Sequence, residues 1–253
     1  MAAAERPVVL ATGTPARRAV PSRARGREAQ PVTSVFRAAL GEDAFSRLHP
    51  MLQRRFDVRL GGEACVGTGV MTQIRRGPSW TVPFLQIGRM RNILIPDVGE
   101  NVPFRIDNRP YLDPFGRETV TFVREYVIDG KRRRFDATMI LSDGRVVDYL
   151  GTHQHLAVDL DLSVQDDGSL LLRSGAQRFH EGPVSFRFPM SLSGRATLRE
   201  RFDDADGRFH IDLEVHNDRF GFLFGYRGSF VCEWMPAGPV PPRLLPLRHE
   251  PRV

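Results

Sequence analysis

Four Asp-Gly pairs divide the central part of the chain, between residues 117 and 235, into short segments that are apolar or that alternate between apolar and polar residues. Asp-Gly supplies the positive backbone angles of a tight type I′ turn, so each pair predicts a β-hairpin. Successive hairpins indicate an antiparallel, up-and-down meander. No long segment has a helical repeat, which argues against an α/β enzyme fold. The pairs are Asp129-Gly130, Asp143-Gly144, Asp167-Gly168 and Asp206-Gly207.

The strands of this meander are clearest at residues 153–164 and 220–234. In the first segment, alternate residues from Leu156 to Val164 are apolar, and those between them are mostly polar. In the second, glycines permit the bends that curve or close a sheet. About eight to ten strands in up-and-down order predict a mainly β fold, a closed or half-closed lipocalin-like barrel that can hold one small ligand.

An aromatic pattern marks the last predicted strand as part of the core. Phe220, Phe222, Phe224 and Tyr226 alternate along this strand, and we expect them to share one buried face. On this interpretation, the substitution Phe222→Ala costs roughly 3–5 kcal/mol of stability.

The two ends of the chain differ in composition from the centre. Residues 1–30 are rich in Arg, Pro and Ala, and we predict a disordered leader. Apolar spacing from Val35 to Phe56, interrupted at Pro50, predicts two or three short helices, and a further short helix is expected over residues 80–92. Residues 31–235 then form a single barrel-like domain. Residues 236–253 are Pro-rich and should form an irregular tail.

Charge and cysteine content narrow the class of protein. The formal net charge is +6, but six arginines lie within residues 1–30, so the charge gives little support for nucleic-acid binding. No apolar run reaches the roughly 18 residues of a membrane span. Cys65 and Cys232 alone make no disulfide framework. We therefore expect a cytoplasmic protein, and the dominance of Arg over Lys suggests a bacterium with a GC-rich genome.

Short motifs recur along the chain, at residues 36–41, 45–48, 122–126, 135–137, 144–151, 198–200, 207–209 and 220–228. Together they resemble the bacterial family known as domain of unknown function 4166. The resemblance covers roughly residues 34–234. The chain departs from the family at Phe56, where the opening helix often ends in His, and at Asp148, where the family has Glu. The family name implies no activity.

His153 and His155 form the sharpest local polar feature. Residues two apart on a strand point the same way, and Asp159 shares this face. Two imidazoles and a carboxylate are the ligand set of non-haem iron and of some zinc sites. The alternative is a polar outer face, because the opposite side of this strand is apolar.

Arg124 lies between Phe122 and Tyr126 on an apolar side of its predicted strand. A buried arginine needs a partner, which is either Asp148 or Glu200 or the carboxylate or enolate of a ligand. Asp148 becomes a candidate general acid or base if it faces the cavity, since desolvation raises the pKa of a carboxyl group.

These residues lead to three alternative functions, and a structural or partner-binding role is a fourth, since apolar sheet faces also form dimers. The first is binding of a small apolar or lipid-like molecule with one polar anchor. The second is a cofactor-independent isomerase or cyclase acting on a natural-product-like intermediate in a biosynthetic pathway. The third is a metal-dependent barrel enzyme that uses His153 and His155. The favoured interpretation includes no metal or cofactor and allows a homodimer. The candidate catalytic residues are Arg124, Asp148, His153 and Tyr226, and the candidate ligand contacts are Arg124, Tyr126, His155, Tyr226 and Arg227.

Overall fold

The computed structural model of the chain describes residues 33–79, 92–93 and 97–253. The predicted leader therefore lies outside the described residues, as does the helix expected over residues 80–92 except for Asn92. The helices in the described part are α1 (Val35–Leu40), α2 (Glu42–Phe45) and α3 (Pro50–Phe56), with single 3-10 turns η2 (Met190–Leu192) and η3 (Pro242–Leu244). The strands are β1 (Glu63–Arg76), β2 (Gly99–Leu112), β3 (Glu118–Ile128), β4 (Lys131–Ser142), β5 (Arg145–Leu150), β6 (Leu156–Val164), β7 (Leu170–Glu181), β8 (Val184–Arg187), β9 (Arg195–Asp203), β10 (Arg208–Asn217) and β11 (Gly221–Pro236).

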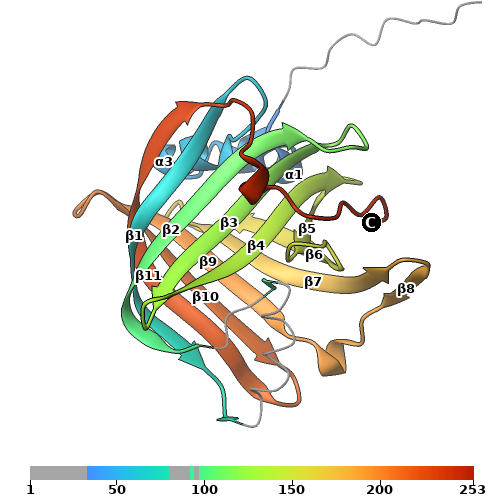
Figure 1. The fold of residues 1–253 in the computed structure, drawn as a ribbon. Coiled ribbons are helices and arrows are strands. Elements are labelled where there is room, and N and C mark those ends of the chain that lie inside the picture. Colours follow the sequence, from blue (N-terminus) through green and yellow to red (C-terminus); the bar gives the residue numbers. More distant parts are fainter. Residues whose placement is uncertain (1–32, 80–91, 94–96) are drawn as a thin grey trace, which may run out of the picture. The chain divides into compact units, whose positions relative to one another are not determined.

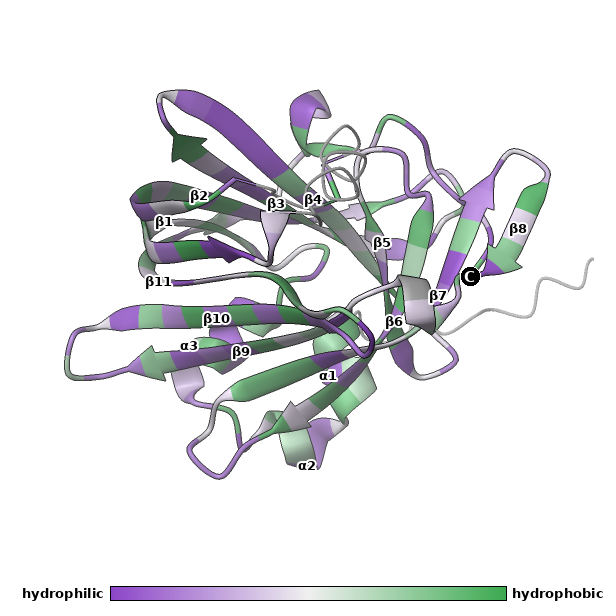
Figure 2. Ribbon diagram, turned by 90° about the horizontal axis from the view of Figure 1, so that it is seen from below, coloured by the Kyte–Doolittle hydropathy of each residue, from purple (hydrophilic) through white to green (hydrophobic). Residues whose placement is uncertain are grey.

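The strands of the described residues form one antiparallel sheet that closes on itself (Figure 1). Along the sheet the order is β6-β5-β4-β3-β2-β1-β11-β10-β9-β7-β8, and β6 also pairs with β7. Because β8 pairs only with β7, the ring closes through the other ten strands. Figure 2 shows hydrophobic and hydrophilic residues alternating along β9 and β10. The predicted closed, mainly β barrel is thus confirmed, together with its short N-terminal helices.

The Asp-Gly pairs lie between consecutive strands, as predicted. Asp129-Gly130 joins β3 to β4, and Asp143-Gly144 joins β4 to β5. In both pairs the two residues have positive φ, from 48° to 75°, which the type I′ turn requires. In the pairs at Gly168 and Gly207 only the glycine has positive φ. Those two connections therefore use glycine for a turn of another type.

The three helices close one end of the barrel. Ser34 caps α1, because its Oγ accepts a hydrogen bond from the Arg37 backbone N–H at 3.1 Å. Phe36 of α1 is fully buried, and its ring packs at 4.9 Å from Phe56 of α3 and at 5.6 Å from Phe122 of β3. At this same end, the His49 N–H before α3 donates to the Gly168 carbonyl at 3.0 Å. The helices therefore form a plug, and the β6–β7 turn lies beside it.

Two predictions about strands are wrong in detail. Two prolines, Pro110 and Pro114, predict a loop over residues 108–115, whereas strand β2 continues to Leu112. A proline removes only one donor from the ladder, and β2 pairs with β3 from Phe104 to Leu112 across Pro110. The predicted aromatic face of β11 is also wrong. Strand β10 pairs Val215 with Phe224 and His216 with Phe222, so Leu223 is an extra residue that forms a β-bulge.

The bulge places the aromatic residues of β11 on two sides of the sheet. Phe224 and Tyr226 are buried, at 5% and 2% exposure. Phe222 is half-buried beside Arg75, whose guanidinium lies 5.0 Å from its ring, and beside His216. Phe220 is exposed. Phe222 is therefore no core residue, contrary to the sequence interpretation.

The segment after β11 contains the 3-10 turn η3 but no strand, and it packs against the barrel. Figure 1 shows it crossing the outside of the sheet towards β5 and β6. Leu244 and Glu250 are buried at 2% and 0% exposure. The Arg243 carbonyl accepts from Arg134 of β4 at 3.0 Å, and the Leu247 N–H donates to the Thr152 carbonyl at 2.7 Å. None of the helices in the described residues has the length and apolar character needed to cross a bilayer.

Candidate ligand site in the barrel cavity

A cavity of about 280 Å³ lies inside the barrel. Most of the side chains around it are aliphatic or aromatic, and they come from β4 to β7 and from β9 to β11. The volume is close to the lower bound of roughly 300–1,000 Å³ that small-molecule sites show. Such a site is typically apolar with a few convergent polar groups, so the polar lining residues decide what it can bind.

Among the buried polar residues that line this cavity, three come from three different strands: Arg124 of β3, Asp148 of β5 and Tyr226 of β11. Their exposures are 5%, 7% and 2%. In the described part of the chain, Arg124 Nε and Nη1, Asp148 Oδ1 and the Tyr226 hydroxyl are buried without a hydrogen-bond partner. Buried polar groups are nearly always paired in folded proteins. The sequence prediction brought these three residues together as candidates, and the structure places them on one cavity.

Arg124 is held by aromatic rings rather than by an acid. Its guanidinium carbon lies 4.9 Å from the Phe135 ring centre and 5.7 Å from that of Phe122. Such cation–π contacts stabilise a desolvated cation only in part. Neither Asp148 nor Glu200 lies within ion-pair distance of Arg124 in the described residues, although both were candidate partners. Glu200 instead pairs with Arg55.

The electrostatics of the cavity depend chiefly on Asp148. Burial raises the pKa of Asp148 to about 7, while the charge of Arg124 acts in the opposite direction. Burial also raises the pKa of Tyr226, so its hydroxyl stays neutral and can donate a hydrogen bond. Near neutral pH the site therefore combines one fixed cation, one neutral donor and one carboxyl group that exchanges its proton readily.

Tyr126 is fully buried but does not line the cavity. Its ring lies 5.7 Å from the ring of Tyr226 and 5.2 Å from that of Phe104. Tyr126 therefore supports Tyr226 from behind, and the structure does not place it as a ligand contact.

Arg227 points away from the cavity, because it follows Tyr226 on the strand and is exposed. It lines a separate concavity on the outer face of the barrel with Arg199 and Arg201. This candidate contact does not join the other residues.

The two candidate metal-binding histidines lie in a turn, not on a strand. Gln154 between them has a φ of 51°, and β6 begins only at Leu156. The rings of His153 and His155 stack at 5.3 Å. Asp159 faces away from them and pairs with Arg178, with one contact at 3.2 Å. In the described residues, side chains at metal-binding spacing occur only at Asp203, Asp206 and His210, so the predicted ligand set is not assembled.

His155 nevertheless reaches the cavity, whereas His153 does not. His155 Nε2 is buried without a partner in the described part of the chain. Its Nδ1 lies 3.1 Å from the His180 carbonyl oxygen and 2.8 Å from Glu181 Oε2. His153 Nδ1 lies 2.9 Å from Thr152 Oγ1. Of the two histidines, His155 is thus the one positioned to contact a ligand.

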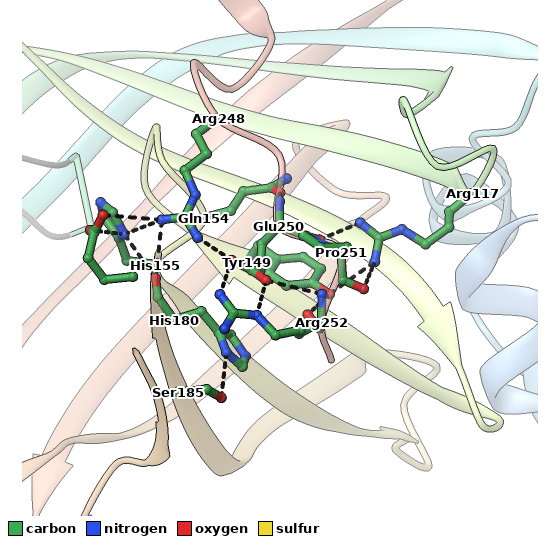
Figure 3. A network of polar contacts seen from close by, with 11 residues as sticks. Arg117, Tyr149, Gln154, His155, His180, Ser185, Arg248, Glu250, Pro251 and Arg252 are labelled. Atoms are coloured by element: carbon green, nitrogen blue, oxygen red, sulfur yellow. Dashed lines mark hydrogen bonds and ion pairs between the residues drawn. The ribbon is translucent and has the colours of Figure 1, made fainter. Parts of the chain in front are cut away.

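The C-terminal segment fixes the turn that carries His155 (Figure 3). The Glu250 N–H donates to Gln154 Oε1 at 2.7 Å, and Gln154 Nε2 donates to Thr138 Oγ1 at 2.6 Å. Arg248 Nη1 lies 3.0 Å from His155 Nδ1. The Tyr149 hydroxyl donates to the Arg252 carbonyl at 2.7 Å. The wall around His155 therefore depends on residues that follow the last strand.

Sequence reasoning missed two further groups near the site. Gln177 lines the cavity, and its Nε2 donates to the Gly194 carbonyl at 2.8 Å. Arg55 of the plug is 1% exposed and donates to Asn108 Oδ1 at 2.8 Å. Arg55 lies three residues after Leu52, on the apolar face of α3. This helical spacing could have indicated that Arg55 is buried.

Comparison with known proteins places this chain in a family. The family model described as domain of unknown function DUF4166 matches residues 48–230. "Uncharacterized protein YndH" of Bacillus subtilis strain 168 is 32% identical over 188 residues, which cover 74% of this chain and 91% of the relative. A crystal structure of a candidate thioesterase II from Thermobifida fusca YX is 10% identical and covers 79% of this chain and 86% of that one, with a TM-score of 0.22. A likeness that weak carries no argument. From the family match and the Bacillus relative, the chain belongs to the DUF4166 family.

Proposed function

We propose that the barrel binds one small, mostly apolar molecule and holds its polar group at Arg124, Asp148 and Tyr226. The observation that carries this proposal is the set of unpartnered buried atoms on these residues, which face a cavity with a mostly apolar lining. An unpaired buried polar group costs about 1–3 kcal/mol. A ligand that pairs with these atoms removes that cost. Its apolar part adds about 25 cal/mol for each Å² withdrawn from water.

The proposal is tested with a small neutral fluorescent probe, 1-aminonaphthalene, titrated into the purified full-length protein. We expect a single site whose fluorescence rises on binding. Leu198→Trp, on the cavity wall, should fill the space and abolish this signal. Val231→Trp, at an exposed position on β11, is the matched control and should bind as the parent does. No binding by the parent, or equal binding by Leu198→Trp, contradicts the proposal.

A second candidate function, a cofactor-independent isomerase or cyclase, is favoured by the composition of the same site. Asp148, with a pKa of about 7, suits proton transfer near neutral pH. Arg124 and Tyr226 would stabilise the negative charge that develops on a substrate oxygen when a neighbouring carbon loses its proton. His153, a fourth candidate, is outside the cavity lining and has no part in this scheme.

Proton exchange distinguishes the enzyme from a simple binding protein. The protein is incubated with octan-2-one in D₂O, and deuterium at the carbons beside the carbonyl is followed by mass spectrometry. An enzyme of this kind accelerates the exchange, and Asp148→Asn removes the acceleration while the probe still binds. Exchange at the rate of the buffer in the parent protein eliminates this candidate and leaves the binding function intact.

A further inference from the structure

We propose that the polar group of the ligand is a carboxylate held by Arg124, so that the ligand is a medium-chain carboxylic acid whose head lies next to the helical plug. This inference rests on the proposed binding function and specifies the chemical class of its ligand.

The unpaired hydrogen-bond donors of the site require an acceptor on the ligand. Arg124 has five N–H donors, and the described residues supply its Nε and Nη1 with no acceptor. The Tyr226 oxygen interacts with the Tyr126 hydroxyl, and the O–H of Tyr226 provides a further donor. A carboxylate offers about four lone-pair positions and matches the planar guanidinium, whereas an alcohol offers a single oxygen. A carboxylate therefore satisfies more of these donors than a neutral head group does.

The single positive charge of the cavity lining favours a ligand with one negative charge. Arginine side chains are cationic, and Arg124 is the only arginine or lysine among the described lining residues of the cavity. Asp148 and His155 are the other titratable groups on this lining besides Tyr226, and His155 Nδ1 is already close to Glu181. Asp148 in its acid form can donate a hydrogen bond to a bound carboxylate. One cation then balances one carboxylate, while a phosphate ester with up to two charges exceeds what one arginine neutralises.

The position of Arg124 sets the direction of the ligand. Arg124 also borders a small void next to the plug, which is lined by Phe36, Arg55 and Glu200. Strand β6 runs between the two ends of the cavity. The turn after β6 contacts the plug through Gly168, whereas His155 lies just before β6. His155 therefore lines the end of the cavity that is remote from the plug. A head group on Arg124 therefore lies at the plugged end. The chain then runs along the leucine-lined wall towards His155.

The size of the cavity limits the length of the acid. Its volume is about 280 Å³. One water occupies roughly 30 Å³ in the liquid, so the space corresponds to on the order of ten non-hydrogen atoms. Octanoate has about that size.

The experiment compares three probes of equal chain length, sodium octanoate, octan-1-ol and octyl phosphate, by calorimetry on the full-length protein at slightly acidic pH. We expect one octanoate per protein, bound at least about tenfold more tightly than octan-1-ol. Arg124→Met should reduce the octanoate affinity by about tenfold or more and leave octan-1-ol binding within about threefold. Arg227→Met, which removes a cation from the exposed face of the same strand as Tyr226, should change neither.

The outcomes separate this inference from the proposed function. Equal affinity for octanoate and octan-1-ol, or an Arg124→Met protein that keeps its preference for octanoate, overturns the carboxylate assignment and leaves the binding function standing. Tighter binding of octyl phosphate also overturns it. If neither these three probes nor 1-aminonaphthalene binds, the proposed function itself fails. If Arg124→Met does not fold, as judged by circular dichroism, the comparison of the three probes on the parent protein still decides.

Discussion

Arg55 of the plug helix α3 and Glu200 of β9 form an ion pair inside the closed end of the barrel, where their side chains are 1% and 3% exposed. The Arg55 guanidinium also lies 4.8 Å from the Phe230 ring centre of β11 and donates to Asn108 of β2. One side chain thus connects the plug to three strands. Because Arg124 lies directly beyond this pair, the plug also forms the base of the candidate site.

We predict that Glu200→Gln strongly destabilises the fold. The substitution leaves the buried Arg55 charge without its counter-ion, and loss of one partner of a buried pair costs roughly 3–5 kcal/mol. Arg54, the neighbouring residue, pairs with Glu63 at 2.7 Å, but both side chains are almost half exposed. Glu63→Gln is therefore the matched control and should cost no more than about 1 kcal/mol. Urea unfolding measures both changes, and equal losses would show that Arg55 is solvated.

The bulge in β11 leads to a prediction about neighbouring residues. Leu223 is 6% exposed and lines the cavity, whereas Phe222 is half-buried on the outer face. Leu223→Ala should therefore cost roughly 2–5 kcal/mol. Phe222→Ala should cost less, about 1 kcal/mol, because the ring is half-buried and lies beside Arg75 and His216 on the outer face. The same urea experiment compares them. A larger loss at Phe222 would place it in the core, as the sequence alone suggested.

Local chemistry explains why much of the fold was predictable. Asp129-Gly130 and Asp143-Gly144 have the turn geometry that their residue types prefer, and the alternation along β6 placed Val158 and Leu160 on the inner face as expected. The same kind of alternation placed Arg124 on an apolar side of its strand, and this pattern alone marked it as a candidate site residue. Predictions of this kind depend only on residues a few positions apart.

The failures depend on contacts between residues distant in sequence. Gln154 holds the turn before β6 through Thr138 and Glu250, so the His153 and His155 pattern does not continue the strand. The Leu223 carbonyl accepts from the Gly77 N–H at 2.7 Å, an interaction with the end of β1 at the bulge. The spacing of residues around Gln154 or around Leu223 does not predict these contacts.

We predict that Glu250 stabilises the C-terminal segment in a pH-dependent way. Burial alone would raise the pKa of Glu250, but hydrogen bonds from the Arg252 side chain and backbone, with the charges of Arg252 and Arg248, lower it to about 2. A carboxylate with a lowered pKa stabilises the folded state above its unfolded pKa, near 4.5, and this contribution is lost as the pH falls towards 2. Glu250→Gln should therefore lower stability at neutral pH by on the order of 2–3 kcal/mol.

Acid titration of the folded protein tests this contribution. The difference in unfolding free energy between the parent and Glu250→Gln should shrink below about pH 4. Glu233→Gln, at an exposed position on β11, is the control and should show little difference at any pH. A difference that stays constant down to strongly acidic pH would show that Glu250 acts through its shape and hydrogen bonds rather than through its charge.

Asp148 should give the opposite dependence on pH. Burial raises the pKa of Asp148 from 3.8 to about 7, so the folded protein keeps a proton that the unfolded chain releases. Stability of the ligand-free protein should therefore decrease as the pH rises from about 4 to about 7, and the full penalty remains above that range. Asp148→Asn lacks this ionisation and should gain stability over the parent, by on the order of 4 kcal/mol at the top of the range. Asp161→Asn, on the exposed side of β6, is the control and should parallel the parent. Urea unfolding at several pH values measures all three proteins, and parallel curves for the parent and Asp148→Asn would mean that water reaches this carboxyl group.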